Sequence, residues 1–207
     1  MEKIIVGVPA QTGAGKDTLG DFLAEAGYLQ ISLSDILRKY AREKDLSTVK
    51  EDLQNLGDSL RLQLGADILA KWASVSDEFQ NAEKIIITGI RHPDEMQFLK
   101  EEFPQTRFIG LKASQLTRFE FSRDRKRAGD PETFEEFRRL DDRETKNHNG
   151  QDHRMNIEEC LNRCDIILFN EKHGNSKAES LQYFKVSVDW ALRKLGINGS
   201  LVNKERG

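Results

Sequence analysis

The sequence predicts an α/β protein, a three-layer sandwich in which helices cover both faces of a five-stranded parallel β-sheet. Short runs that are apolar at nearly every position alternate with amphipathic helical segments along the 207 residues. Continuous apolar strands between helices are typical of a parallel sheet that is buried on both faces. No internal repeat and no linker-like stretch divides the chain. We therefore expect a single domain over residues 1–207.

Each expected element follows from a local pattern. Strands are expected where apolar residues cluster, at Lys3–Pro9, Tyr28–Leu33, Lys84–Thr88, Arg107–Leu111 and Asp165–Phe169. Helices are expected where apolar residues recur at helical spacing, at Lys16–Ala26, Ser34–Arg38, Ser47–Ser74, Glu95–Phe103, Gln115–Arg127, Pro131–Glu144 and Ala178–Leu195. Ser34 and Asp35 are expected to cap the short helix that runs through Arg38.

Charge and hydropathy exclude several classes of partner. The net charge of −3 gives no electrostatic case for binding nucleic acid or an anionic membrane. No apolar run approaches the roughly 20 residues that a membrane-spanning helix needs, and the first apolar run is too short for a signal peptide. Cys160 and Cys164 are too few for a zinc site and are expected to be reduced thiols. We therefore expect a cytoplasmic protein.

The strongest functional signal is a glycine-rich loop between the first strand and the first helix. Its residues are Gly13, Ala14, Gly15, Lys16, Asp17 and Thr18. Backbone N–H groups of such a loop, with a helix N-terminus behind them, gather negative phosphate oxygens, and side chains in place of the glycines would block their approach. We expect Lys16 to reach the β- and γ-phosphates of ATP and the Thr18 hydroxyl to face Mg²⁺.

The loop has the form A-x-x-G-x-G-K-x-T, with Ala10 in place of the first glycine of the usual P-loop. It resembles the loop of the nucleoside monophosphate kinases, and the string G-K-D-T is similar to that of phage-type deoxynucleoside monophosphate kinases. The resemblance implies a P-loop NTPase fold with an acceptor-binding insert at about residues 35–80 and a helical lid at about 115–150. Asp17 stands where many P-loop proteins carry the magnesium-binding hydroxyl, which makes Thr18 the candidate metal ligand.

The segment Ile31–Arg38 resembles the adenylate kinase pattern I-S-x-x-D-x-L-R. In that family the arginine grips the phosphate of the acceptor nucleotide, which implies this role for Arg38. A planar guanidinium binds phosphate through two parallel hydrogen bonds, so the chemistry agrees. Asp35 has two possible roles, as a carboxylate that orients the attacking oxygen or a magnesium-bound water, and as a helix N-cap.

Two further segments carry candidate acceptor ligands. The end of the third strand, Thr88–Pro93, resembles the D-G-x-P-R segment of the kinase superfamily, which implies that Arg91 is a second phosphate ligand. Thr88 stands where that family usually has aspartate. Leu53–Arg61 resembles the acceptor-binding helices of the deoxynucleoside monophosphate kinases, which implies that Arg61 reaches the acceptor phosphate. A solvated ion pair between Arg61 and Asp58 is the alternative.

The resemblance also places residues of the lid and of the base-binding end. A basic cluster follows the fourth strand, at Arg118, Arg123, Arg125, Lys126 and Arg127. In the lid, such arginines neutralise the charge of the transferring group, and Arg123 and Arg127 are four residues apart and can face one site together. A solvated helix face is the alternative. Asn170, after the last strand, corresponds to a residue that borders the adenine in related kinases.

The expected function is transfer of the γ-phosphoryl group from ATP·Mg²⁺ to a nucleoside or deoxynucleoside monophosphate. A dephospho-coenzyme A kinase and a phosphomevalonate-type kinase are the alternatives within this fold. A nucleotide-binding regulator without efficient transfer is an alternative of another class. A phosphorylated acceptor requires Arg38 and Arg91, whereas an alcohol acceptor requires Asp35 as the catalytic base.

Overall fold

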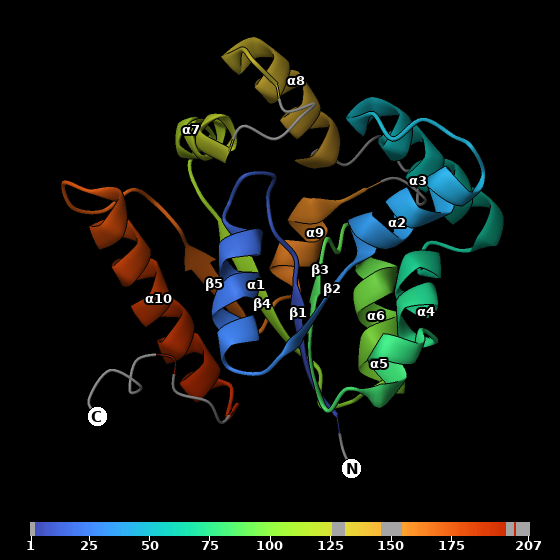
Figure 1. The fold of residues 1–207 in the computed structure, drawn as a ribbon, viewed down its shortest axis with the longest axis horizontal. Coiled ribbons are helices and arrows are strands. Elements are labelled where there is room, and N and C mark those ends of the chain that lie inside the picture. The colour runs from blue at the N-terminus through green and yellow to red at the C-terminus, as the bar shows by residue number, and fades with distance from the viewer. Residues whose placement is uncertain (1–2, 126–130, 146–154, 198–200, 202–207) are drawn as a thin grey trace.

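The computed structural model of this chain describes residues 3–125, 131–145, 155–197 and 201. Five parallel strands form one sheet in the order β2-β3-β1-β4-β5. The strands are β1 (Ile4–Val8), β2 (Leu29–Ser32), β3 (Lys84–Thr88), β4 (Arg107–Lys112) and β5 (Ile166–Phe169). The predicted five-stranded parallel sheet is confirmed. Because the strands are parallel, their carboxyl ends share one edge of the sheet, the upper edge in Figure 1.

Helices cover both faces and the carboxyl edge of the sheet. They are α1 (Lys16–Glu25), α2 (Leu33–Glu43), α3 (Lys50–Leu64), α4 (Ile68–Ser74), α5 (Asp77–Asn81), α6 (Pro93–Glu102), α7 (Gln115–Arg125), α8 (Phe134–Thr145), α9 (Ile157–Asn162) and α10 (Lys177–Lys194). Helices α1 and α10 lie on one face, and α6 and α9 on the other, whereas α3, α7 and α8 lie above the carboxyl edge (Figure 1). Within the described part of the chain, no helix is both long and apolar enough to cross a membrane.

The central strands carry consecutive apolar residues because their side chains enter two separate cores. In β3, Ile85 and Ile87 pack into the core under α6 and α9, and Ile86 points to the core under α1 and α10. In β1, Ile5 and Val6 divide in the same way. Successive strand residues point to opposite faces, so a sheet covered on both sides needs apolar residues at every position. Burial of each such side chain contributes about 1.5–3 kcal/mol.

Two helix predictions were wrong in their boundaries. The expected helix Ser47–Ser74 is divided into α3 and α4, because Gly65 adopts φ 106° and ψ 145°, which ends the helical hydrogen bonding. The second is the short helix expected to end at Arg38: α2 runs from Leu33 to Glu43, and its cap is Ser32 and not Ser34 with Asp35. The Ser32 hydroxyl accepts a hydrogen bond from the Asp35 backbone N–H at 3.3 Å.

Candidate active site

The glycine-rich loop lies at the carboxyl edge of the sheet, between β1 and α1. Gly13 has φ 83° and Gly15 has φ 98°, in the left-handed region that favours glycine. A Cβ on Gly13 would lie 2.5 Å from the carbonyl oxygen of Arg118, and a Cβ on Gly15 would collide with the Asn170 amide. Both positions therefore exclude larger residues, and the loop stays narrow enough for its backbone to line a ligand site.

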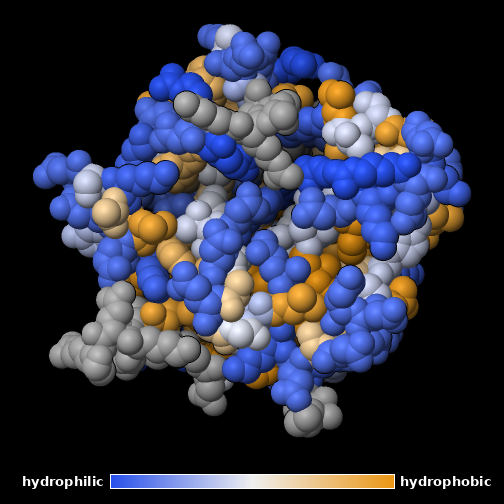
Figure 2. All heavy atoms as spheres, in the orientation of Figure 1, coloured by the Kyte–Doolittle hydropathy of each residue, from blue (hydrophilic) through white to orange (hydrophobic). Residues whose placement is uncertain are grey.

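Two cavities meet at this loop. The first, which we call the α3 cavity, measures about 420 Å³ and lies between the loop, α2, α3 and the end of β3. The second, the α10 cavity, measures about 580 Å³ and lies between the loop, α7 and the start of α10. Gly13, Lys16 and Arg125 line both cavities. On the surface, Figure 2 shows a hollow bordered by hydrophilic side chains near its upper centre.

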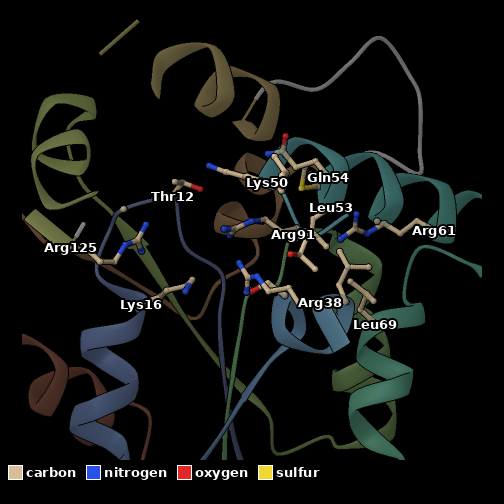
Figure 3. Close-up of a pocket in the computed structure, with 18 residues that line it drawn as sticks. Thr12, Lys16, Arg38, Lys50, Leu53, Gln54, Arg61, Leu69, Arg91 and Arg125 are labelled. Carbon is tan, nitrogen blue, oxygen red and sulfur yellow. The ribbon is translucent and has the colours of Figure 1, made fainter. Parts of the chain in front are cut away.

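The α3 cavity is strongly cationic. Its basic lining residues are Lys16, Arg38, Lys50, Arg61, Arg91 and Arg125, and no described residue that lines it is acidic. In Figure 3 the charged ends of Lys16, Arg38 and Arg91 point into the same space. The remaining wall is largely apolar, with Leu37, Val49, Leu53, Leu69 and Met155. A cavity of this kind suits a ligand with an anionic end and an apolar body.

The pKa of the Lys16 amine is lowered overall by its surroundings. Burial lowers the pKa of its amine; the adjacent Asp17 carboxylate raises it, and the nearby Arg91 and Arg125 add to the lowering. In the structure, Lys16 Nζ forms an ion pair with Asp17 Oδ1, and Arg125 Nη1 lies 3.4 Å from Asp17 Oδ2. The Asp17 carboxylate therefore bridges two of the cations that line both cavities.

Arg38 lines the α3 cavity as predicted, but Asp35 does not. Arg38 Nη1 donates a hydrogen bond of 2.6 Å to Asp35 Oδ1. The Asp35 side chain is 64% exposed, and it is Ser34 that borders the cavity. The alternative role of Asp35 as the N-cap is wrong, because Ser32 is the cap. The structure thus brings Asp35 to Arg38 and not to Lys16 or the loop.

A buried carboxylate, Glu95, holds the two other predicted acceptor ligands. Glu95 is fully buried and accepts hydrogen bonds from the backbone N–H groups of Arg91 at 2.8 Å and His92 at 3.0 Å. It also accepts one from Arg61 Nη2 at 3.3 Å. Arg91 Nη1 in turn donates to the carbonyl oxygen of Ala10, at the start of the loop, at 2.6 Å. Glu95 thus connects α3 and the β3–α6 turn to the phosphate loop.

Arg61 is more deeply buried than predicted. It is only 5% exposed, and its guanidinium lies 3.5 Å from Asp58 and 3.3 Å from Glu95. The alternative ion pair with Asp58 is therefore present, but it is buried and not solvated. Two carboxylates therefore offset the charge of Arg61.

Helix α7 presents a different arginine from the one predicted. Arg123 is exposed and lines neither cavity, whereas Arg125 lines both. Arg127, the other predicted lid residue, lies outside the described residues. Arg118 is buried, donates to the carbonyl oxygen of Thr12 at 3.0 Å and forms an ion pair with Asp141 of α8. Arg118 and Arg125 are seven residues apart, about two helical turns, and this spacing was the signal in the sequence.

The predicted base-binding residue, Asn170, supports the loop itself. Its side-chain Nδ2 donates to the carbonyl oxygen of Ala14 at 3.1 Å, and Asn170 also lines the α10 cavity. The next residue, Glu171, accepts hydrogen bonds from Thr117 Oγ1 at 2.7 Å and Ser114 Oγ at 3.0 Å. Burial raises the pKa of Glu171, but these hydrogen bonds outweigh it, so the pKa is lowered overall. The β5–α10 connection therefore fixes both the loop and the start of α7.

The chain offers a modest ligand set for a magnesium ion. Asp17 and Thr18, both in the first turn of α1, line the α10 cavity, so a carboxylate and a hydroxyl lie beside the loop. No group of three or more His, Cys, Asp and Glu side chains with metal-binding geometry occurs in the described residues. One carboxylate with phosphate oxygens and water suits Mg²⁺.

At the end of β3, the fully buried Thr88 Oγ1 has no hydrogen-bond partner within the described ranges.

The fold is similar to that of a known P-loop kinase. Shikimate kinase from Bacteroides thetaiotaomicron superposes with a TM-score of 0.53 at 12% identity, over 89% of this chain and 98% of that chain. The similarity confirms the predicted P-loop fold class. At this level of identity it carries no information on the acceptor.

The chain is similar in sequence to UPF0200 proteins, although no family model matches it. A UPF0200 protein of Thermococcus sibiricus is 27% identical over 197 residues, which cover 93% of this chain and 94% of the relative. A UPF0200 protein of Hyperthermus butylicus is 31% identical over 139 residues, covering 67% of this chain and 74% of the relative. The shared sequence includes most of both chains, and the protein therefore belongs to the UPF0200 family.

Proposed function

We propose that this protein is a kinase that transfers the γ-phosphoryl group of ATP to the phosphate group of a small phosphorylated acceptor. A nucleoside or deoxynucleoside monophosphate is the first candidate. One observation carries the proposal: two cavities of ligand size open on either side of the glycine-rich loop and share Lys16 and Arg125. A phosphoryl group passing from one ligand to the other would cross the point where these two cations lie.

The α10 cavity is the proposed ATP site. The loop N–H groups and Lys16 would hold the phosphates, with the N-terminus of α1 behind them. The base would lie toward α10, where Phe121, Leu181 and Phe184 provide apolar surface. Bound magnesium would neutralise charge on the β- and γ-phosphates, and the residues placed to hold it are Asp17 and Thr18.

The α3 cavity is the proposed acceptor site. Arg38 and Arg91 would bind the acceptor phosphate, because a guanidinium matches phosphate through paired hydrogen bonds. The apolar wall formed by Leu37, Leu53 and Leu69 would hold the rest of the acceptor. The volume of about 420 Å³ falls within the range of about 300–1,000 Å³ typical of small-molecule sites. Charge and shape both favour a phosphorylated small molecule.

The same cavity weighs against an alcohol acceptor. A hydroxyl nucleophile needs a base within hydrogen-bond reach. Asp35, the predicted base, is exposed and paired with Arg38, and no carboxylate lines the α3 cavity among its described residues. A phosphate oxygen is already anionic and needs no such base. Phosphomevalonate therefore remains the second candidate acceptor, ahead of dephospho-coenzyme A.

In this mechanism the chain acts by position and charge. Lys16 and the loop amides hold the donor, Arg38 and Arg91 hold the acceptor, and Arg125 offsets the charge of the group in transfer. Holding two reactants in line and surrounding the transferring group with fixed cations are the main sources of rate enhancement in phosphoryl transfer. Helices α7 and α8 lie above the site (Figure 1).

An ADP-release assay tests the proposal. The acceptor panel contains every ribo- and deoxyribonucleoside monophosphate, phosphomevalonate and dephospho-coenzyme A, each supplied with ATP and Mg²⁺. We expect selective turnover of one or two phosphorylated acceptors, and loss of that turnover with Lys16→Ala. Turnover of dephospho-coenzyme A alone would refute the phosphate-acceptor assignment. ATP binding without turnover of any acceptor would favour a nucleotide-binding regulator and refute the proposal.

A further inference from the structure

The carboxylate of Asp17 occupies an unusual place in the glycine-rich loop. It follows Lys16 directly, where many P-loop proteins have a hydroxyl, and it lies in the first turn of α1. Its two oxygens contact two different cations, Lys16 Nζ on one side and Arg125 Nη1 at 3.4 Å on the other. Both cations line both cavities. In the structure, therefore, one carboxylate neutralises the charges that the proposed transfer requires.

This arrangement opposes the binding of a nucleotide without metal. The phosphates of free ATP would have to replace the carboxylate as the partner of Lys16 and would then lie beside the negative charge of Asp17. Like charges brought together in a partly buried site destabilise a complex. The Asp17 side chain is 45% exposed, so screening by solvent reduces the effect without removing it.

A divalent cation would reverse the sign of this interaction. A carboxylate oxygen is a preferred ligand of Mg²⁺, which typically binds one or two carboxylates together with substrate phosphates. With Asp17 turned to the metal, Lys16 and Arg125 would be released to the phosphates. The neighbouring Thr18, predicted from the sequence as the ligand, supplies only a neutral hydroxyl from the same helical turn.

We propose that Asp17 is a magnesium ligand of the nucleotide complex. When Mg²⁺ binds, the Asp17 carboxylate leaves Lys16 and Arg125 and contacts the metal, and this exchange of partners makes nucleotide binding dependent on Mg²⁺. This inference rests on the proposed ATP site in the α10 cavity. It assigns the metal to Asp17 in place of the predicted Asp35, which is 64% exposed, pairs with Arg38 and lines neither cavity. It also assigns Arg125 a place in the exchange, because its Nη1 contacts Asp17 Oδ2.

The test is the affinity for ATP and ADP by titration calorimetry, with excess Mg²⁺ and with EDTA, for the wild type and Asp17→Asn. Asparagine keeps the shape and removes the charge. We expect the variant to bind metal-free ATP about tenfold more tightly, since Lys16 has lost its competitor. With Mg²⁺ we expect it to bind at least about tenfold more weakly, since the metal has lost a ligand. The affinity gain from Mg²⁺ should thus fall about 100-fold.

Asp21→Asn is the matched control. Asp21 lies one turn further along α1 and also borders the α10 cavity, so its replacement removes the same charge from the same helix. It should leave the affinity gain from Mg²⁺ at the wild-type value. If Asp17→Asn behaves like Asp21→Asn, or if its metal-free affinity falls, the inference is wrong and Asp17 serves only the N-terminus of α1.

Two additions keep the outcomes distinct. Asp17→Ser restores the usual hydroxyl and replaces Asp17→Asn in the test if circular dichroism shows that the asparagine variant does not fold. The serine variant must then bind metal-free ATP more tightly than the wild type and gain less affinity from Mg²⁺. Wild-type protein that binds ATP with the expected metal dependence, but phosphorylates no acceptor, would refute the proposed function and support the role of Asp17. Wild-type protein that binds neither nucleotide under either condition would refute both.

Discussion

Replacement of Glu95 by alanine should reduce the stability of this protein more than any ordinary helix substitution. Glu95 is fully buried in α6 and accepts hydrogen bonds from the backbone N–H groups of Arg91 and His92 and from Arg61 Nη2. Alanine would leave these donors without their acceptor. It would also leave the guanidinium of Arg61, 5% exposed, with Asp58 as its remaining carboxylate partner at 3.5 Å.

The magnitude follows from the burial of the pair. Removal of one partner of a buried ion pair typically costs about 3–5 kcal/mol, because the other charge stays in a poorly solvated site. For a chain of this size, 1 kcal/mol corresponds to roughly 2–4 °C in Tm. We therefore expect Tm to fall by roughly 6–20 °C. Glu95→Gln should fall between alanine and wild type, since its amide oxygen still accepts hydrogen bonds.

Urea unfolding followed by circular dichroism measures the effect, with Glu101→Ala as the control. Glu101 is an exposed glutamate on the same helix, and its replacement should change the free energy of unfolding by no more than about 0.5 kcal/mol. A loss for Glu95→Ala within about 1 kcal/mol of the control would refute the reasoning, since it would show that the buried contacts add little net stability. Where Glu95→Gln folds, the KM of the acceptor should rise more than the Kd of ATP, because one acceptor oxygen and the charge that hold Arg61 and the Arg91 turn are lost.

Three further predictions concern the site and its pH dependence. Arg38→Ala should raise the acceptor KM by at least about tenfold and leave the Kd of ATP unchanged, since a charged hydrogen bond contributes about 1.5–3 kcal/mol. If the variant loses only ATP affinity, measured by titration calorimetry, Arg38 belongs to the donor side. Arg125→Ala should lower kcat at least about a hundredfold in the ADP-release assay, whereas Arg123→Ala, on the exposed face of α7, should not; equal effects would contradict the assignment. Because the pKa of Glu171 is lowered in the folded state, its charged form stabilises the protein at pH values above the ordinary pKa of 4.5. This stability is lost as the pH falls through the folded-state pKa. The wild type should therefore exceed Glu171→Gln in thermal stability at neutral pH, by a margin that shrinks in acid; a constant margin would argue against it.

Local pattern was enough to predict the sheet and the phosphate loop. In β1 and β3, consecutive residues are apolar because they face two cores in alternation, and this pattern is visible without any knowledge of the partners. The loop is equally local, because Gly13 and Gly15 adopt backbone angles that other residues avoid. The fold class and the position of Lys16 at the start of α1 were therefore determined by the sequence alone.

The tertiary structure decided which charges face the site. Arg61 and Glu95 are 34 residues apart, and no local signal shows that they form a buried pair. The position of Asp35 in the sequence is compatible with a catalytic carboxylate, yet in the structure its side chain is exposed to solvent and pairs with Arg38. On α7, both Arg123 and Arg125 lie in one basic run. The contacts of Arg118 with Asp141 and with the carbonyl oxygen of Thr12 help to fix the helix where Arg125 reaches Asp17. The direction of a long charged side chain depends on contacts between distant segments, and these contacts exist only after the chain has folded.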